Sequence, residues 1–494
     1  MGAARRWAVP VCAAGLVLAG PGTPARAAEA PAYAYDSEAR AVNAADATSD
    51  AVRLVAGGVY RSGLGGRGKS YFKVELDARA TTYVSVTAVP GADELPAFND
   101  GLKLALQDAN GLTCSSDTVT FGSVVGARPI TAWAVREVRA GRSVCQDAGT
   151  YYVVVERAGE GGEKKEKDEA GKASGDTSGN PFSSSSPSGS PDPSGSAGSS
   201  GSSGSAGSSG TPGTSESSED GDSWGLELAV VDEPPAGPGG ATAAPEGWSS
   251  ATPSPMEGDP RRLPGGAGFA TATDLEQGAW RDDILPGQTL YYAVPVAWGQ
   301  QVYVAAELGS GGDGSGYVAS ALDVTLFNPV RAKVDDLRFG YDGEQKAGAL
   351  RPLAPVDYAN RYAASEAVNG MRFAGAYYLA VHLSEQAGEK FGDQAYGVTL
   401  RVRVKGAAGA GPGYRGESVP GGLFGTGGSA SAPRGAGGAG ETRAAGGTGG
   451  EDRGAMVVVA AGGFGAGTLV LVVLGVWTLL GRRQMRVRAQ KPIA

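Results

Sequence analysis

Two short motifs near the N-terminal end have the spacing of known chemistry. Gly63-x-Gly65-x-x-Gly68 matches a dinucleotide-binding loop, which must leave a strand and open a helix. Here it leads into an alternating, strand-like run, so we expect no nucleotide site. Ser70-x-x-Lys73 has the spacing of a serine nucleophile and its lysine, but residues three apart share a face only on a helix. We expect a solvent-facing Lys73 on a strand.

The other candidates for catalysis or metal binding are single residues. His382, the only histidine, lies in an alternating run at 377–383 and has no partners for a metal site or a catalytic triad. The loop 309–316 offers one carboxylate, Asp313, whereas calcium takes six or more oxygens. No G-x-S-x-G motif is present. The sequence therefore predicts no catalytic residue, no cofactor and no metal site.

Three cysteines occur in the chain, at positions 12, 114 and 145. Cys12 lies within a predicted signal peptide, which leaves Cys114 and Cys145 in the mature chain. A lone pair of cysteines in an exported protein favours a disulfide, and two cysteines alone are too few for a zinc site. We predict a disulfide between Cys114 and Cys145.

Aromatic side chains are prominent in the second half of the chain. Trp280, Trp298 and Tyr303 exceed what a small β core requires, which makes them a possible ligand surface. The alternative is that the three rings belong to the core.

The N-terminal residues 1–27 have the features of a secretory signal peptide. Arg5 and Arg6 precede an apolar run of about 14 residues, too short to span a bilayer, and Ala25-Arg26-Ala27 is a typical cleavage site. The paired arginines leave the choice between general secretory and twin-arginine export open.

The C-terminal part contains a predicted transmembrane helix. Residues 455–481 carry no charge, and the tail 482–494 that follows contains four arginines and a lysine. A basic flank is retained on the cytoplasmic side, so we predict a single-pass membrane protein with its N-terminal region outside the cell. Without the basic residues of the signal and the tail, the formal charge of −9 becomes −17. Such an acidic region is a poor partner for nucleic acid.

The region between signal and helix contains an internal duplication. Residues 71–76, 82–86, 102–106 and 148–152 match residues 291–296, 302–306, 322–326 and 374–378 in order and pattern. The matched runs alternate apolar and polar residues, as strands with one buried face do. In 398–404, for instance, four apolar residues alternate with Thr399, Arg401 and Arg403. We predict a mainly β chain with two tandem β-sandwich, jelly-roll-like domains.

The last strand of the first domain is separated from the rest by a low-complexity stretch. Residues 224–230 match 396–402, so the Ser/Gly/Pro-rich residues 159–222 are a predicted disordered insert in a strand connection. We expect 224–230 to pair as a hairpin with the strand before the insert. The predicted boundaries are 50–233 for the first domain, 234–267 for a linker, 268–405 for the second domain and 406–454 for a Gly-rich stalk.

The order of motifs in each unit resembles the bacterial pre-peptidase C-terminal domain. The similarity comprises a strand with Tyr71-Phe72 or Tyr291-Tyr292, a Leu-x-Leu-x-Leu-like strand, and Ala-Gly-x-Tyr-Tyr before a valine-rich strand. This resemblance implies a small β-sandwich that serves as an accessory or binding domain without catalytic residues. The whole layout is similar to single-pass surface proteins of high-GC actinobacteria.

These observations favour a non-enzymatic cell-surface protein that presents two β-sandwiches to a wall component or an envelope protein. The alternative is an extracytoplasmic enzyme, or an accessory subunit of one, that uses carboxylates. A carboxylate enzyme should show two acidic residues converging in a cleft, and a binding module an exposed apolar patch.

Overall fold

The computed structural model describes residues 30–159 and 223–425, except for residues 67, 92, 93, 125, 140, 255 and 257. All of these belong to one compact unit. The predicted signal peptide, the predicted insert 159–222 beyond its first residue, the predicted transmembrane helix 455–481 and the tail lie outside the described residues. No helix within the described part is long and apolar enough to cross a membrane.

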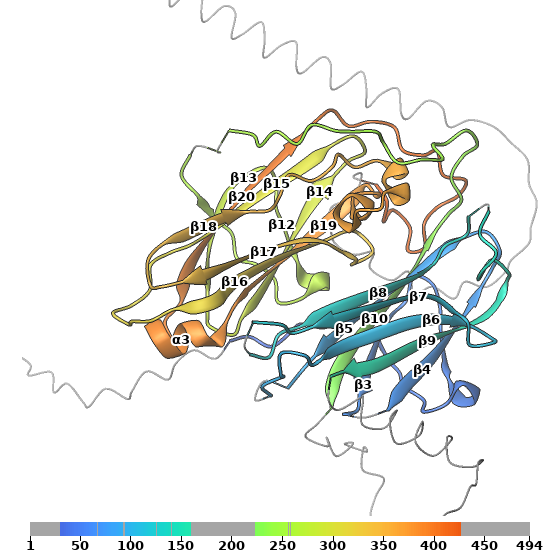
Figure 1. Ribbon diagram of the computed structural model, residues 1–494, viewed down its shortest axis with the longest axis horizontal. Coiled ribbons are helices and arrows are strands. Elements are labelled where there is room, and N and C mark those ends of the chain that lie inside the picture. The colour runs from blue at the N-terminus through green and yellow to red at the C-terminus, as the bar shows by residue number, and fades with distance from the viewer. Residues whose placement is uncertain are drawn as a thin grey trace, which may run out of the picture. The chain divides into compact units, whose positions relative to one another are not determined.

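The first sandwich consists of two five-stranded sheets (Figure 1). One has the order β1-β3-β10-β5-β8 and the other the order β2-β4-β9-β6-β7. The strands are β1 (Arg40–Ala41), β2 (Val52–Leu54), β3 (Val59–Leu64), β4 (Lys69–Leu76), β5 (Thr81–Val89), β6 (Gly101–Asp108), β7 (Thr113–Thr120), β8 (Ile130–Arg136), β9 (Gly149–Ala158) and β10 (Trp224–Glu233), with the 3₁₀ helix η1 (Thr48–Asp50).

The second sandwich repeats this topology, with every strand number raised by ten. Its sheets have the orders β11-β13-β20-β15-β18 and β12-β14-β19-β16-β17. The strands are β11 (Arg261–Arg262), β12 (Thr273–Asp274), β13 (Gly278–Ile284), β14 (Thr289–Val296), β15 (Gln301–Leu308), β16 (Val318–Phe327), β17 (Lys333–Tyr341), β18 (Lys346–Ala349), β19 (Gly375–Leu383) and β20 (Tyr396–Lys405). Its helices are η2 (Phe269–Thr271), η3 (Tyr358–Tyr362), α2 (Glu366–Gly370) and α3 (Glu385–Phe391). The predicted pair of tandem β-sandwiches is confirmed.

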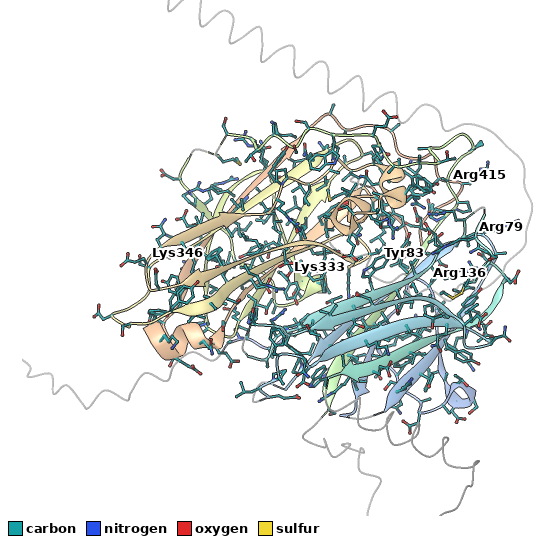
Figure 2. All side chains as sticks on the ribbon, viewed as in Figure 1. Arg79, Tyr83, Arg136, Lys333, Lys346 and Arg415 are labelled. Carbon is teal, nitrogen blue, oxygen red and sulfur yellow. A yellow bond between two sulfur atoms is a disulfide. The ribbon has the colours of Figure 1, made fainter. Side chains whose placement is uncertain are left out.

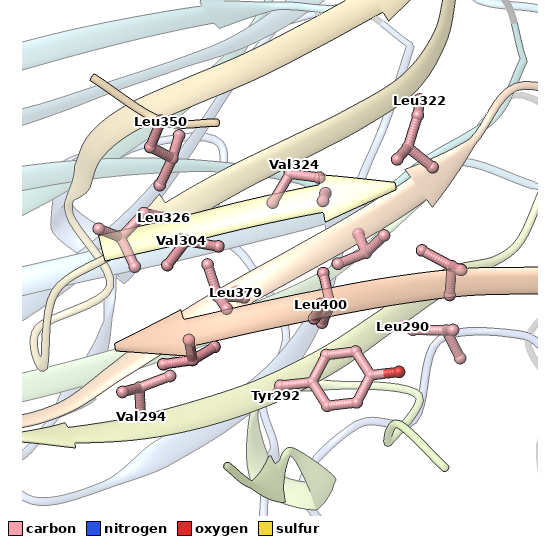
Figure 3. Packing of buried hydrophobic residues seen from close by; sticks show 14 of the residues in the cluster. Leu290, Tyr292, Val294, Val304, Leu322, Val324, Leu326, Leu350, Leu379 and Leu400 are labelled. Atoms are coloured by element: carbon pink, nitrogen blue, oxygen red, sulfur yellow. The ribbon is translucent and has the colours of Figure 1, made fainter. Parts of the chain in front are cut away.

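The strands form because apolar residues recur at every second position. In β4, for example, Phe72, Val74 and Leu76 are buried while Lys69 and Glu75 are exposed. Each sandwich buries such residues from both of its sheets in its own core. Figure 3 shows the second core, where Leu290 and Tyr292 of one sheet lie near Val304 and Leu400 of the other.

The residues 159–222 interrupt a connection between sheets, so the predicted hairpin is wrong. β9 pairs with β4 and β6, whereas β10 pairs with β3 and β5 in the opposite sheet. Periodicity identifies which face of a strand is buried but not which strand it pairs with. The corresponding connection of the second sandwich, between β19 and β20, needs only residues 384–395.

Replacing residues 159–223 by a twelve-residue Gly/Ser connector should leave the first sandwich folded. A shorter connection loses less closure entropy, so the free energy of unfolding should rise by about 1.5 kcal/mol, as measured by urea unfolding. A direct join of Ala158 to Trp224 is the control and should unfold the sandwich, because neighbouring Cα atoms lie about 3.8 Å apart whereas packed sheets lie about 10 Å apart. A folded protein with the direct join would contradict the cross-sheet connection.

Three segments predicted to lie outside the sandwiches pack against them. Residues 30–49, before the predicted start of the first domain, include β1 and a backbone bond from Ala34 N to Ala267 O. In the expected linker, Trp248 packs on the second core. In the expected stalk, residues 406–425 approach β10 through the bridge between Asp232 and Val419, and the ring of Phe424 stacks on Phe373. Residues 406–425 of the predicted stalk are therefore packed, and residues 426–454 lie outside the described part of the chain.

Candidate functional site

Two carboxylates of β10 join the sandwiches through arginines of the second one. Glu227 is fully buried and lies 2.6 Å from Nη1 of Arg331, which follows β16. The Glu227 carboxylate also accepts hydrogen bonds from the Tyr33 hydroxyl and the Asp36 amide. Burial alone would lower the pKa of Arg331, but the Glu227 carboxylate raises it above its ordinary value.

Glu233, at the end of β10, binds three groups from distant parts of the chain. Its carboxylate lies 2.5 Å from Nη2 of Arg361 in η3 and accepts hydrogen bonds from the hydroxyls of Tyr83 and Tyr414. Burial and the Glu233 charge raise the pKa of Tyr414. Tyr83, labelled in Figure 2, packs edge-on against Phe373 at 5.4 Å in an apolar cluster shared by both sandwiches. The two sandwiches thus share buried polar and apolar contacts.

A cavity of about 880 Å³ is lined by both sandwiches. The first contributes β7, β8 and the connection between them, and the second contributes β14, β16, β17, β19 and the region of α2. Its charged lining residues are five acids and five bases, namely Asp117, Asp323, Asp335, Asp336, Glu366, Arg128, Lys333, Arg338, Arg351 and Arg372.

Most of these charges are paired within the cavity wall. Asp323 is buried and lies 3.0 Å from Nε of Arg338 and 3.8 Å from Nη2 of Arg128. Asp336 pairs with Lys333, which is labelled in Figure 2. Asp335 pairs with Arg351.

Arg372 is the exception among the bases of the described cavity. Its side chain is only 4% exposed, and its Nε and Nη2 atoms have no hydrogen-bond partner in the described part of the chain. The guanidinium carbon lies 5.2 to 5.5 Å from the ring centres of Tyr83, Trp133 and Phe373, within the range of cation–π attraction. Rings alone do not replace the hydrogen bonds that a buried guanidinium loses with water.

His382 of β19 also lines the cavity and is 3% exposed. Its Nδ1 lies 3.0 Å from the Thr289 hydroxyl, and its Nε2 has no partner among the described residues. Burial, helped by the positive charge of Arg128, lowers the pKa of His382 to about 3. The ring is therefore neutral at physiological pH.

This neutral histidine should make the protein sensitive to mild acid. The folded pKa lies below the unfolded value of about 6.5, so the unfolded chain takes up the proton first and stability falls as the pH drops from 6.5 towards 3. At pH 5 the wild type should lose about 2 kcal/mol more than His382→Gln, relative to pH 7. Urea unfolding of both proteins at the two pH values measures this difference. Parallel losses would contradict a neutral buried His382.

Two carboxylates of the cavity have no described ion pair. Asp117 of β7 accepts a hydrogen bond from the Trp133 amide. Burial raises the pKa of Asp117, and the charge of Glu366 raises it further. Glu366 is exposed. Of these two acids, only Asp117 is partly buried.

The structure separates the three aromatic residues predicted as a ligand surface. Trp280 is opposite Leu400 and faces the core, so it does not belong to a surface. Tyr303 is opposite Arg403 and lies on the other face of the same sheet. Trp298 follows β14, and its carbonyl accepts a hydrogen bond from Gly409. The prediction counted aromatic residues without knowing which face of each strand is buried.

The remaining predicted features are found as follows. Cys114 and Cys145 form the expected disulfide. Ser70 is buried and Lys73 lies on the opposite face of β4, as predicted for a strand. The Gly63 motif runs from β3 into β4 without a helix. Among the described residues, no group of three His, Cys, Asp or Glu side chains could hold a metal. Among the described residues, the most exposed large apolar side chains are Leu95 and Phe98, at 72% and 70% exposed, in the loop between β5 and β6.

The sequence contains one sign of this cavity, which is a change in the spacing between the two repeats. The matched runs are offset by 220 residues up to 102–106, but by 226 at 148–152. The extra residues belong to the segment 350–374, which contains η3, α2 and Arg372. The position of Arg372 corresponds to Gln146 in the first repeat, which indicates a feature specific to the second copy.

No protein-family model and no curated protein matches this chain. Among solved structures, a periplasmic inhibitor of g-type lysozyme from Aeromonas hydrophila is 14% identical, covers 26% of this chain and 95% of its own, and has a TM-score of 0.15. The tandem CBM22 domains of Xyn10C from Paenibacillus barcinonensis are 9% identical, with 71% and 92% covered and a TM-score of 0.15. The CUB1-EGF-CUB2 region of human MASP-1/3 is 7% identical, with 70% and 99% covered and a TM-score of 0.16. TM-scores this low carry no argument about fold or function.

Proposed function

We propose that this chain is a non-enzymatic binding protein of the cell envelope that holds a ligand between its two sandwiches, outside the cell. The observation that carries this proposal is the cavity of about 880 Å³, which is lined by charged and polar side chains of both sandwiches. Its size lies in the range of about 300 to 1,000 Å³ that is usual for small-molecule sites.

The sequence and the disulfide support an extracytoplasmic location. Disulfides persist in oxidising compartments, and the bond between Cys114 and Cys145 is formed. The predicted signal peptide 1–27, the uncharged residues 455–481 and the basic tail 482–494 support a single-pass protein whose C-terminus is cytoplasmic. The resemblance of the repeats to the pre-peptidase C-terminal domain supports an accessory or binding role.

One observation favours the alternative of a carboxylate enzyme. Asp117 is a partly buried carboxyl with a raised pKa in a cavity, as a general acid requires. General acid–base hydrolysis needs a second carboxylate with a matched environment, and the unpaired candidate, Glu366, is exposed. A binding role does not require a second carboxylate, and it agrees with the hydrogen bond that holds Asp117 at the Trp133 amide.

Hydrogen exchange of the full-length protein in detergent, with and without fractions of an envelope extract, tests the binding proposal. One fraction should slow amide exchange in β7, β8 and α2, which form the cavity wall, without being consumed. Protection confined to other parts of the protein would contradict the proposal.

Turnover measurements distinguish the enzyme. The binding proposal would be wrong if the wild type consumes a substrate, Asp117→Asn does not, and the control Asp313→Asn does. The protein would then be the carboxylate enzyme. Asp313 is a suitable control because it is exposed and does not line the cavity.

A further inference from the structure

One strand that lines the cavity has a free edge. β7 is the last strand of its sheet, and its residues 117–120 line the cavity. The Phe121 amide donates to the Asp100 carbonyl, so every second residue of β7, including 117 and 119, bonds to β6. The residues between them direct their backbone groups away from β6. Thr118 and Thr120 are exposed and lie on this free edge.

The free edge carries backbone groups that have no partner among the described residues. These groups are the amide of Thr120 and the carbonyls of Thr118 and Thr120. Burial raises the pKa of Asp117, and the amides of Trp133 and Thr118 counteract this, so the Thr118 amide is partly engaged. An extended chain presents donors and acceptors at the same spacing of two residues, so a further strand fits this edge.

The comparable strand edges nearby are closed. The Trp133 and Val135 amides on the free edge of β8 donate to side chains of β7, at 3.2 and 2.6 Å. In the second sandwich, α2 packs against β17, the counterpart of β7, and a Cβ added at Gly370 would lie 3.2 Å from Cα of Val334. Proteins cap or cover strand edges because an open edge pairs with other chains. β7 is open where its neighbour and its counterpart are closed.

The charges of the cavity favour a basic side chain on such a strand. Asp117 and Glu366 have no described ion pair, and burial and the nearby Glu366 charge both raise the pKa of Asp117. Four of the five bases are paired with acids, and the fifth, Arg372, is buried. A lysine or arginine that enters the cavity would therefore be attracted to the two acids.

We infer, on the basis of the proposed binding function, that the cavity holds an extended peptide segment of another protein, which pairs with the free edge of β7 and places a lysine or arginine beside Asp117 and Glu366. The backbone groups of Thr118 and Thr120 continue the sheet into the peptide. Main-chain hydrogen bonds then supply affinity, and the basic side chain supplies selectivity.

Binding of methylated peptides to the full-length protein in detergent tests the pairing by calorimetry. The probe is an acetylated, amidated hexapeptide that alternates threonine and valine and has lysine as its third residue. Methylation of its backbone amides on the edge that faces β7 should weaken binding at least about tenfold. Methylation on the other edge should change the affinity less than about twofold, because those amides point away from β7. Equal effects of the two methylation patterns, or no binding of the unmodified peptide, would overturn the inference.

A second pair of probes tests the basic side chain. Replacing the lysine of the peptide by glutamine should weaken binding about fivefold, and Asp117→Asn should remove most of this difference. The control Asp313→Asn changes an exposed acid that does not line the cavity, and should keep the difference. Equal binding of the lysine and glutamine peptides to the wild type would overturn this part of the inference.

Proline variants locate the pairing on the protein. Thr120→Pro removes an amide that faces the free edge and leaves the bonds to β6 intact, so the protein should fold and bind the peptide at least about fivefold more weakly. The control is Ala347→Pro in β18. Because the Leu350 amide donates to the Val304 carbonyl, the amide of Ala347 also faces a free edge, outside the cavity. This control should keep the wild-type affinity.

The proline variants also give a clear negative result. Unchanged peptide affinity in a folded Thr120→Pro protein would overturn the pairing with β7. If Thr120→Pro does not fold, the two methylation patterns on the wild-type protein decide.

Hydrogen exchange distinguishes other occupants of the edge. The Thr120 amide should exchange fast in the free protein and slowly with the peptide. Slow exchange in the free protein would overturn the inference in favour of a segment of this chain or a second copy.

The two proposals can fail separately. If an envelope fraction protects the cavity wall but the peptide does not bind, the binding function stands and the extended peptide is wrong. If the peptide pairs with β7 but no envelope fraction protects the wall, the pairing stands and the proposed envelope ligand is wrong.

Discussion

Replacing Arg331 by methionine should lower the free energy of unfolding by about 3 to 5 kcal/mol. The methionine keeps the unbranched stem but removes the cation that lies 2.6 Å from the fully buried Glu227 carboxylate. Because the Tyr33 and Asp36 bonds do not neutralise it, a buried charge would remain. Urea unfolding measures the loss.

Two further variants test whether this loss of stability comes from the buried Glu227 charge. Arg262→Met removes an ion pair whose side chains are 59% and 41% exposed, and should cost less than about 1 kcal/mol. Adding Glu227→Gln to Arg331→Met should recover part of the loss, because the buried charge is then gone. Similar small losses for Arg331→Met and Arg262→Met would show that Glu227 is not desolvated in solution.

Removing the disulfide should have the second large effect. Cys114 and Cys145 are 31 residues apart, and the chain-entropy model assigns about 3 to 4 kcal/mol to a loop of this size. The Cys145 carbonyl also accepts a hydrogen bond from the fully buried Arg136, labelled in Figure 2, whose guanidinium is bound by five backbone carbonyls. Loosening this loop therefore weakens the cage around Arg136 as well.

Urea unfolding of Cys114→Ser/Cys145→Ser measures the loss, with the wild type in reductant as the matched comparison. Both should lose stability by a similar amount. A reductant effect that persists in the double variant would show that the loss comes from something other than this bond.

The strands of both sandwiches could be predicted from the sequence because their alternation is a local property. The runs at 71–76 and 291–296 became β4 and β14, and the repeat order gave the shared topology. Pairing is not local, so the hairpin between β9 and β10 was predicted wrongly.

The cavity could not be predicted because its lining comes from both sandwiches, and the sequence does not show how the two pack together. The sequence does not distinguish a buried arginine from an exposed one. Only the fold places the rings of Tyr83 and Trp133 around Arg372. The Gly-rich composition of 406–425 predicted a solvated tether, although the segment packs. Its aromatic residues Tyr414 and Phe424 are atypical of a solvated tether.

The position of β10 in its sheet has a consequence for biosynthesis. β10 lies between β3 and β5, so these two strands have no partner on their inner edges until Glu233 is free to fold. The 65 residues from 159 to 223 separate β9 from β10 and so lengthen the interval during which a partly emerged chain exposes two open strand edges. Shortening them would shorten that interval.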